Sequence, residues 1–302
     1  MSAITGGLSA VTAGTARSGR TGTATSDMFA ADNTLYIEGS RSPGNERVPS
    51  FLANTANVVV RIAGLRRQFA HEDARARHVA RGGARTPARP SAAMRRRFDI
   101  AVEARHGHEV YTVAPRSGSP GGHVVYLHGG AYVNPISRWH WAFIARLAER
   151  LGMTFTVPLY PRAPEHDCAA ASAFLLSVYG DLVASRDASD LVVMGDSAGG
   201  GLSLSLATQA RAAKLPAPAG LVLVSPWLDV AVSDPAQERI ERLDPLLMRR
   251  GLAAAGRWYA GTMATHDPRV SPIHGDLAGL PPTLLFCGTR DILLSDARRL
   301  VA

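Results

Sequence analysis

Residues 191–200, with the sequence LVVMGDSAGG, constrain the fold of this chain more than any other stretch. A short apolar run leads into a Gly-x-Ser-x-Gly turn, and a helix-like segment follows over 201–213. This order predicts a strand, a sharp turn and a helix, with Ser197 held in a strained backbone conformation at the turn. Gly195 and Gly199 are expected where any side chain would collide with the neighbouring helix or strand. We therefore predict that the Ser197 hydroxyl is lifted clear of the sheet as a candidate nucleophile.

Strand-like and helix-like segments alternate from residue 98 onward. Strands are expected at 98–104, 109–113, 124–127, 154–159, 191–194, 221–225 and 283–287, and helices at 139–151, 169–185 and 202–213. The first two strands are expected to pair around a turn at Gly107. The alternation predicts an α/β fold, a mostly parallel sheet with helices on both faces.

The chain of 302 residues is long enough for one catalytic domain with a small cap. Residues 1–50 are rich in Ser, Thr, Gly and Ala and are predicted to be disordered, or an over-extended start with the true one near Met28. Residues 51–97 are predicted to form an N-terminal helical cap, in which 51–81 is an amphipathic helix. The α/β domain is placed at 98–302, with a second cap insertion at 232–280.

The net charge of +8 is concentrated in one region. Residues 61–105 hold twelve arginines against four acidic residues, and the rest of the chain is balanced. Such a stretch could contact an anionic membrane surface, which is kept as an alternative hypothesis. Nucleic acid is not expected as a partner, because no aromatic residues alternate with the arginines to stack on bases. The chain holds a single lysine, Lys214, so the arginine bias can also reflect codon composition.

The start of the chain shows no basic and apolar pattern typical of a secretory signal, and no run approaches the length of a membrane span. The two cysteines, Cys168 and Cys287, give no disulfide framework. Together these features predict a cytoplasmic protein.

Two further segments supply chemistry to a serine nucleophile. His128-Gly129-Gly130-Ala131-Tyr132 directly follows the expected strand at 124–127, and a glycine pair there lets backbone N–H groups turn towards the site. These N–H groups, with that of Ala198 after the serine, predict an oxyanion hole. Asp291 lies just past the strand at 283–287, where the acid partner of such a serine is expected.

The chain resembles the bacterial hormone-sensitive-lipase-like esterases, an α/β-hydrolase group. The motifs that carry this resemblance lie at 128–132, 160–166, 195–200, 225–229, 271–272 and 288–291. The resemblance covers residues from about 98 to the end of the chain, and the segment at 51–81 is similar to the N-terminal cap of the family.

The resemblance implies hydrolysis of carboxylic esters of small to medium acyl chains through an acyl-enzyme, with no metal and no cofactor. It implies that Ser197 is the nucleophile and Asp291 the acid. The oxyanion donors would be Gly130, Ala131 and Ala198, with Gly129 shaping the loop. Ala131 stands where many members have another glycine, which matters little because only its N–H is used.

The base of the family is a histidine that follows the acid after one more strand, and residues 292–302 contain no histidine. His128 is expected to fix the oxyanion loop and His166 to be structural. The other histidines are not expected to replace the base. His266 and His274 lie in the insertion, and the remaining four are assigned to the surface and loops (His106, His108, His123 and His140). We therefore expect a chain truncated before its base, with the last strand and helix of the domain missing and the activity impaired.

Two structural consequences would follow from such a truncation. Residues 284–286 would lie on an exposed sheet edge, and 288–302 would have little to pack on.

The alternative function is a non-catalytic small-molecule binder on an esterase fold. The sequence does not indicate an oligomeric state.

Overall fold

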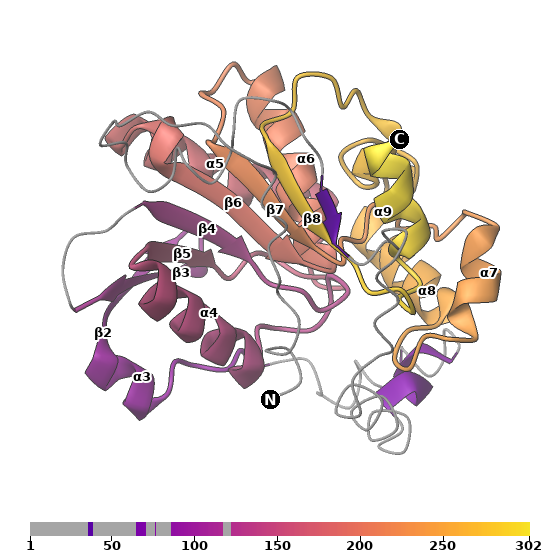
Figure 1. Cartoon of the computed structure of the whole chain (residues 1–302), viewed down its shortest axis with the longest axis horizontal. Helices are drawn as coiled ribbons and strands as arrows, with labels where there is room; N and C mark the ends of the chain where they lie inside the picture. The colour runs from indigo at the N-terminus through magenta and orange to yellow at the C-terminus, as the bar shows by residue number, and fades with distance from the viewer. Residues whose placement is uncertain (1–35, 39–64, 71–75, 77–85, 117–121) are drawn as a thin grey trace, which may run out of the picture.

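The computed structural model describes residues 36–38, 65–70, 76, 86–116 and 122–302. Their strands form one eight-stranded sheet in the order β1-β8-β7-β6-β4-β5-β3-β2 (Figure 1). The strands are β1 (Tyr36–Glu38), β2 (Phe98–Arg105), β3 (His108–Pro115), β4 (His123–Leu127), β5 (Thr154–Pro158), β6 (Leu191–Asp196), β7 (Gly220–Val224) and β8 (Thr283–Phe286). The helices are α3 (Ala92–Arg97), α4 (Arg138–Leu151), α5 (Cys168–Ser185), α6 (Ala198–Ala212), α7 (Ala236–Glu241), α8 (Arg249–Ala260) and α9 (Leu294–Val301), with 3₁₀ turns η1 (Leu65–Phe69), η2 (Ala188–Asp190) and η3 (Pro272–His274).

The predicted mostly parallel sheet is confirmed. Strands β5, β4, β6, β7, β8 and β1 run parallel, whereas β3 is antiparallel to both β5 and β2. The hairpin of β2 and β3 turns at His106 and Gly107, both with positive φ, as the expected turn at Gly107 requires. The carboxyl ends of β4, β6, β7 and β8 therefore lie along one edge of the sheet, where ligands bind in such folds.

Alternating side chains of the central strands face two cores, which places helices on both faces. On β6, Val192 and Met194 pack in a cluster with α4, whereas Leu191 and Val193 pack in a cluster with α5 and α6. Figure 1 shows α4 and α6 on opposite sides of the sheet. Because successive strand residues point to opposite faces, a strand segment buried on both sides is expected to be apolar at every position, as residues 191–194 of β6 are.

The sheet edge beside β8 differs from the expectation. β1 pairs in parallel with β8, with Ile37 opposite Leu285, so the prediction that 284–286 form an exposed edge is wrong. The prediction of disorder over 1–50 is also wrong for residues 36–38, and the rest of that range lies outside the described residues. After β8, Ile292, Leu293 and Ala297 are fully buried, which corrects the expectation that 288–302 pack on little.

The predicted N-terminal cap lies largely outside the described residues. Where it is described, 65–69 form the 3₁₀ turn η1, so a continuous α-helix over 51–81 is wrong at this point. η1 packs on α8: the buried Phe69 lies against Gly251, where a Cβ would come within 2.4 Å of the Phe69 Cα. Arg66 Nη2 donates to the Glu241 carbonyl at 2.5 Å. These contacts join the two segments that the sequence assigns to a cap.

α3 lies within the range predicted as the cap but packs on the sheet. Its Met94 is buried in the same cluster as Phe98 of β2. Ser91 caps the helix by accepting a hydrogen bond from the Met94 N–H at 3.1 Å.

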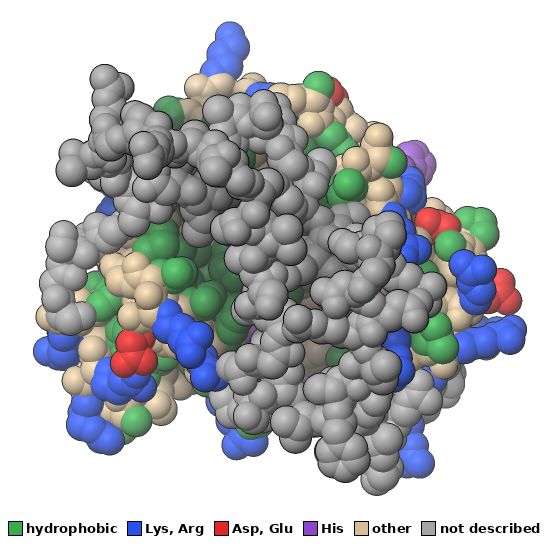
Figure 2. Space-filling view, viewed as in Figure 1, with side chains coloured by type: hydrophobic (Ala, Val, Ile, Leu, Met, Phe, Trp, Pro, Cys, Tyr) green, Lys and Arg blue, Asp and Glu red, His purple; other side chains and the backbone are tan. Residues whose placement is uncertain are grey.

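In the described part of the basic region, Arg89, Arg97 and Arg105 form ion pairs, and Arg116 just beyond the region forms another. Arg89 pairs with Glu109 at 3.0 Å and Arg116 with Asp99 at 2.9 Å. Arg97 pairs with Glu149, and Arg105 pairs with both Glu103 and Asp181. On the face drawn in Figure 2, the blue basic side chains are spread around the periphery. The hypothesis of a basic membrane-contacting surface stays a prediction.

α5 has the length and apolar composition of a membrane span, which the sequence reading did not find. Phe174, Leu175 and Val178 are buried in the core cluster that α5 shares with α6. α5 is therefore a core helix of the domain, for which an apolar composition is ordinary.

Candidate active site

Ser197 lies at the sharp turn between β6 and α6. Its backbone has φ 52° and ψ −118°, a strained conformation for a residue with a side chain. The strain is held by backbone hydrogen bonds: the Ser197 N–H donates to Val224 O at 2.9 Å, and its carbonyl accepts from Gly200, Gly201 and Trp227. The side chain makes no cap hydrogen bond to α6 and is half-buried. The turn thus has the geometry of a nucleophile elbow.

Both glycines of the Gly-x-Ser-x-Gly motif are required by close packing. A Cβ on Gly195 would lie 2.2 Å from the Gly199 carbonyl oxygen, and one on Gly199 would lie 1.9 Å from the Leu127 carbonyl oxygen. No real Cβ approaches backbone so closely, so only glycine fits either position. The collisions predicted from the sequence are therefore present in the structure.

The loop after β4 presents backbone N–H groups beside the elbow. Gly130, Ala131 and Tyr132 all have positive φ, at 137°, 55° and 61°. The Gly130 carbonyl accepts from Val133 and Asn134 N–H groups, which turns the loop back on itself. Within the described residues, the N–H groups of Gly130, Ala131 and Ala198 donate no hydrogen bond.

Gly129, which was expected to shape the oxyanion loop, does not have a free N–H donor. Its N–H donates to Asp196 Oδ1 at 3.0 Å. A Cβ on Gly129 would also lie 2.3 Å from Asp196 Oδ2. Gly129 therefore packs the loop against the elbow, and of the four residues predicted for the oxyanion hole, Gly130, Ala131 and Ala198 have N–H groups without an acceptor among the described residues.

Asp196 was not singled out in the sequence, yet it connects the elbow to its surroundings. Besides Gly129, its Oδ1 accepts from the Tyr126 hydroxyl at 2.6 Å, and Oδ2 lies 3.5 Å from His140 Nε2. Burial acts to raise the pKa of this carboxyl, but the hydrogen bonds from His140, Tyr126 and Gly129 outweigh it and lower the pKa. Asp196 is therefore a half-buried carboxylate stabilised by three donors.

His140 was assigned to the surface or a loop, and that assignment is wrong. It lies in the first turn of α4, where its Nδ1 accepts the Ser137 N–H at 2.9 Å while the Ser137 hydroxyl caps the helix. Because Nδ1 is an acceptor, the ring proton of neutral His140 is on Nε2, which faces Asp196. The sequence signal was the spacing from Ser137 to His140, which is that of a capping box.

His128 fixes the oxyanion loop, as predicted. Its Nδ1 donates to the Gly129 carbonyl at 2.8 Å, and its ring stacks on Tyr160 with centroids 4.5 Å apart. The Tyr160 hydroxyl donates to the His128 carbonyl at 2.7 Å. Complete burial lowers the His128 pKa to about 3, so the ring is neutral at physiological pH.

Asp291 follows β8 at the same sheet edge as Ser197. Its Oδ1 accepts the Leu293 N–H at 2.9 Å, and its carboxyl also forms a hydrogen bond with the Ser225 side chain just after β7. Burial, together with the nearby charge of Asp244, raises the Asp291 pKa to about 6. Asp244 also holds the loop that contains Asp291, because the Asp244 Oδ2 accepts the Ile292 N–H at 2.9 Å.

In the described part of the chain, no histidine forms a hydrogen bond or an ion pair with Ser197 or Asp291. His123 is buried, not at the surface as expected: it bonds Thr156 and Arg186, and burial lowers its pKa to about 4. His274 of the insertion lies 3.8 Å from Asp229. His106 contacts Ser177 at the exposed hairpin turn. The described residues also hold no group of three metal-ligating side chains.

Comparison with known proteins assigns the family. Residues 124–302 match the family model described as alpha/beta hydrolase fold. The chain belongs to this family. A solved esterase of the bacterial hormone-sensitive lipase family superposes with a TM-score of 0.69 at 25% identity, over 84% of each chain. The resemblance to hormone-sensitive-lipase-like esterases is thereby confirmed.

Curated relatives match over shorter lengths. An esterase of Acinetobacter venetianus is 35% identical over 178 residues, which is 58% of this chain and 59% of that protein. An acetyl-hydrolase of Streptomyces hygroscopicus is 35% identical over 179 residues, which is 59% of this chain and 60% of that protein. The chain thus spans about three fifths of the length of these relatives.

Proposed function

We propose that this α/β hydrolase cleaves carboxylic esters with Ser197 as the nucleophile. The observation that carries the proposal is the strained Ser197 backbone between β6 and α6. Beside it, the N–H groups of Gly130, Ala131 and Ala198 donate no hydrogen bond among the described residues. We propose small to medium acyl esters as substrates, supported by the names of the relatives, which are an esterase and an acetyl-hydrolase.

The proposed reaction has two halves. The Ser197 Oγ attacks the ester carbonyl carbon as a base takes its proton, and the carbonyl oxygen becomes an oxyanion bound by the three N–H groups. Collapse breaks the bond to the alcohol, which leaves with the proton from the base. Water then attacks the acyl-enzyme in the same way, and the carboxylic acid leaves as Ser197 is restored.

Asp291 is proposed as the acid that would orient the base. The position of Asp291 supports this role. Asp291 follows the carboxyl end of β8 and Ser197 follows that of β6, and these two strands flank β7. The Asp291 pKa of about 6 leaves the carboxyl mostly ionised at neutral pH, as an acid that stabilises an imidazolium must be.

We further propose that residues 1–302 alone turn over esters slowly. Support comes from the described histidines, whose hydrogen bonds and ion pairs are with groups other than Ser197 and Asp291. Removing the histidine of a catalytic triad lowers kcat by about a million-fold, although an oxyanion hole leaves some catalysis.

The test combines labelling with chemical rescue. The chain is treated with a fluorophosphonate probe, and p-nitrophenyl acetate hydrolysis is measured with and without added imidazole, each beside Ser197→Ala. We expect the probe on the Ser197 peptide and a Ser197-dependent hydrolysis that rises with imidazole, because imidazole supplies a base. No Ser197 labelling together with identical rates for both proteins would refute the proposal.

The second candidate function is that of a non-catalytic binder of small molecules. It is favoured by the same observation, because no described histidine contacts Ser197 as a base. The two differ in one measurement. A binder gives saturable binding of an ester or carboxylate with no Ser197-dependent turnover in imidazole, whereas the hydrolase gives turnover. The cytoplasmic location stays a prediction.

A further inference from the structure

β2 forms one end of the sheet, opposite the end formed by β1 (Figure 1). Among the described residues, β3 is its only strand partner. β2 is eight residues long, and its residues 101–104 are exposed. A strand of this length at a sheet edge presents N–H and C=O groups that can pair with another strand, unless a proline or a bulge blocks them. β2 contains no proline, and its register with β3 is continuous.

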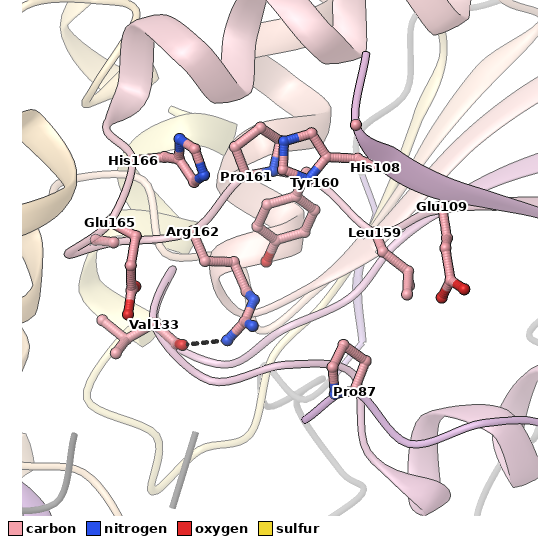
Figure 3. Close-up of a pocket in the computed structure, with 12 residues that line it drawn as sticks. Pro87, His108, Glu109, Val133, Leu159, Tyr160, Pro161, Arg162, Glu165 and His166 are labelled. Atoms are coloured by element: carbon pink, nitrogen blue, oxygen red, sulfur yellow. Dashed lines mark hydrogen bonds between the residues drawn. The ribbon is translucent and has the colours of Figure 1, made fainter. Parts of the chain in front are cut away.

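The hairpin of β2 and β3 is held from the side of β3. β3 pairs with β5, and at its start His108 and Glu109 line a pocket of about 380 Å³ together with residues of the segment 159–166 (Figure 3). The His108 ring also contacts the rings of His166 and Phe174, at centroid distances of 5.4 and 5.3 Å. Because these contacts fix the hairpin, β2 is a preorganised edge, which lowers the cost of pairing with a further strand.

The backbone groups of β2 that face away from β3 follow from the hairpin turn. The turn at 106–107 has two residues, both at positive φ, and Arg105 and His108 flank it. In such a turn the two flanking residues direct their backbone groups at each other. This direction alternates along an antiparallel pair, so Val102 and Ala104 direct their N–H and C=O groups away from β3.

The side chains of β2 form one apolar face and one charged face. Alternate residues give Ile100, Val102 and Ala104 on the first face, and Asp99, Glu103 and Arg105 on the second. Val102 lies at the middle of the apolar face and is 41% exposed. A strand that pairs here must therefore cover an apolar face on one side and match both signs of charge on the other.

We propose that two copies of this chain pair through antiparallel β2 strands, with Val102 of each copy opposite Val102 of the other. A two-fold axis perpendicular to the sheet keeps the two apolar faces on the same side and closes the assembly at two chains. In this register Asp99 lies opposite Arg105 of the second copy, and the symmetry makes this pair twice. The smallest slide that keeps the faces matched places Glu103 opposite Asp99 or opposite a second Glu103, and like charges so placed are destabilising.

The ion pairs within the chain are compatible with this arrangement. Arg116 pairs with Asp99 Oδ1 at 2.9 Å, and the Asp99 side chain is 65% exposed, so Oδ2 can accept from Arg105 of the second copy. Arg105 pairs with Glu103 at 2.8 Å and with Asp181, which holds its side chain on the charged face of β2. The dimer therefore extends a network in which charges of opposite sign alternate.

The first test is sedimentation equilibrium of the full chain over the micromolar range. We expect a dimer whose dissociation constant rises about tenfold in Asp99→Arg and in Arg105→Asp, because each change replaces two attractive pairs by two repulsive ones. The double variant exchanges the charges and is expected to restore the dimer. Asp276→Arg is the matched control, since it also reverses an exposed acid of a surface ion pair, with Arg211, but lies outside β2.

The second test is a disulfide cross-link that reports the register. Cα atoms of a hydrogen-bonded antiparallel pair lie about 5.5 Å apart, so Val102→Cys is expected to cross-link the two copies on oxidation. Ala104→Cys lies on the same face, but in this register its two copies are offset by about 13 Å and are not expected to cross-link. Cys168 and Cys287 are both buried and do not compete.

Val102→Pro tests the use of the β2 backbone. It removes an N–H that faces away from β3, a position where an edge strand tolerates proline, and we expect a folded monomer. A wild-type monomer at every concentration would overturn the proposal, as would a dimer that Asp99→Arg and Val102→Pro both leave unchanged. Cross-linking of Ala104→Cys without cross-linking of Val102→Cys would overturn the register. Should Val102→Pro fail to fold, loss of the dimer in Asp99→Arg and its return in the double variant decide the question. Ser197→Ala is expected to dimerise as the wild type does, so the result is independent of the proposed hydrolysis.

Discussion

The Asp196 carboxylate joins the nucleophile turn to the oxyanion loop, because its Oδ1 accepts the Gly129 N–H at 3.0 Å. Asp196 directly precedes Ser197, and Gly129 directly precedes the first proposed oxyanion donor. The positions of nucleophile and donors are therefore linked through one half-buried carboxylate, whose other partners are Tyr126 and His140.

Gly129→Ala is expected to destabilise the fold, because its Cβ would lie 2.3 Å from Asp196 Oδ2 and 2.8 Å from the Asp196 carbonyl oxygen. Relief requires a shift of the loop or the carboxylate, and we expect a loss of about 1–3 kcal/mol in the free energy of unfolding. Urea denaturation measures the loss, and slower fluorophosphonate labelling of Ser197 is expected beside it.

The matched control is Gly180→Ala in the interior of α5. The nearest atom to its Cβ would be a Leu215 methyl carbon at 3.9 Å, an ordinary contact. Alanine is favoured over glycine within a helix, so this variant is expected to gain about 0.5–1 kcal/mol. If the two substitutions had the same effect, close packing of Gly129 on Asp196 would be refuted.

Tyr160→Phe is expected to lower both stability and the reactivity of Ser197. The change leaves the buried His128 carbonyl without the hydroxyl that donates to it at 2.7 Å, at a loss of about 1–3 kcal/mol. Tyr179→Phe removes a hydroxyl that donates to the Pro216 carbonyl, also at 2.7 Å and away from the elbow. We expect a comparable change in unfolding for both variants, but slower Ser197 labelling only for Tyr160→Phe. Equal labelling rates would contradict a role for Tyr160 in holding the loop.

The elbow could be predicted from sequence because its cause is local. A few consecutive residues determine both the turn at Ser197 and the collisions at Gly195 and Gly199. The mostly parallel sheet around them was predicted from the alternation of strand-like and helix-like segments, whereas the order of its strands was not. The start of α6 was placed too late, at Gly201 instead of Ala198, because a run of glycines disfavours a helix. Close contacts with Leu127, Pro226 and Trp227 require small residues there and override that propensity.

The features that were missed depend on partners distant in the chain. His140 looks like a surface residue until α4 is packed beside β6, which brings it to Asp196. β1 is a strand of three residues whose pairing with β8 no local pattern indicates. The pocket at His108 and His166 likewise forms only when the hairpin turn meets the loop after β5.

His140→Ala tests the link between α4 and the elbow. The variant removes the N–H that faces the half-buried Asp196 carboxylate, and we expect a loss of about 1–3 kcal/mol in unfolding free energy. Faster amide hydrogen exchange at Gly129 is expected as well, since the carboxylate that holds it becomes less fixed. His140→Gln keeps an N–H donor and should recover part of both effects, whereas His106→Ala at the exposed turn should change neither. If hydrogen exchange at the Gly129 amide were unaltered in His140→Ala, the inference that His140 holds the Asp196 carboxylate against Gly129 would be refuted.

Asp296→Asn is expected to stabilise the chain above pH 6 and not at pH 4. Burial and the charge of Asp229 raise the Asp296 pKa from 3.8 to about 6. The folded state therefore holds a proton that the unfolded state releases between these values, so the free energy of unfolding falls as pH rises through this window. A shift of this size corresponds to about 2–3 kcal/mol at neutral pH. The asparagine N–H₂ can also donate to Gln237 Oε1, a buried atom that lacks a partner among the described residues.

Urea denaturation at pH 4.0 and pH 7.5 measures this difference. Asp276→Asn is the matched control, because its exposed side chain pairs with Arg211 at the surface and should change stability by less than about 0.5 kcal/mol at either pH. Asp291 has a raised pKa in wild type and variant alike, so its contribution to the pH dependence cancels from the comparison. A pH-independent effect of Asp296→Asn would mean that Asp296 packs well as a carboxylate and is not titrating in this window. The gain above pH 6 follows only if α9 buries an acid that the fold holds partly protonated.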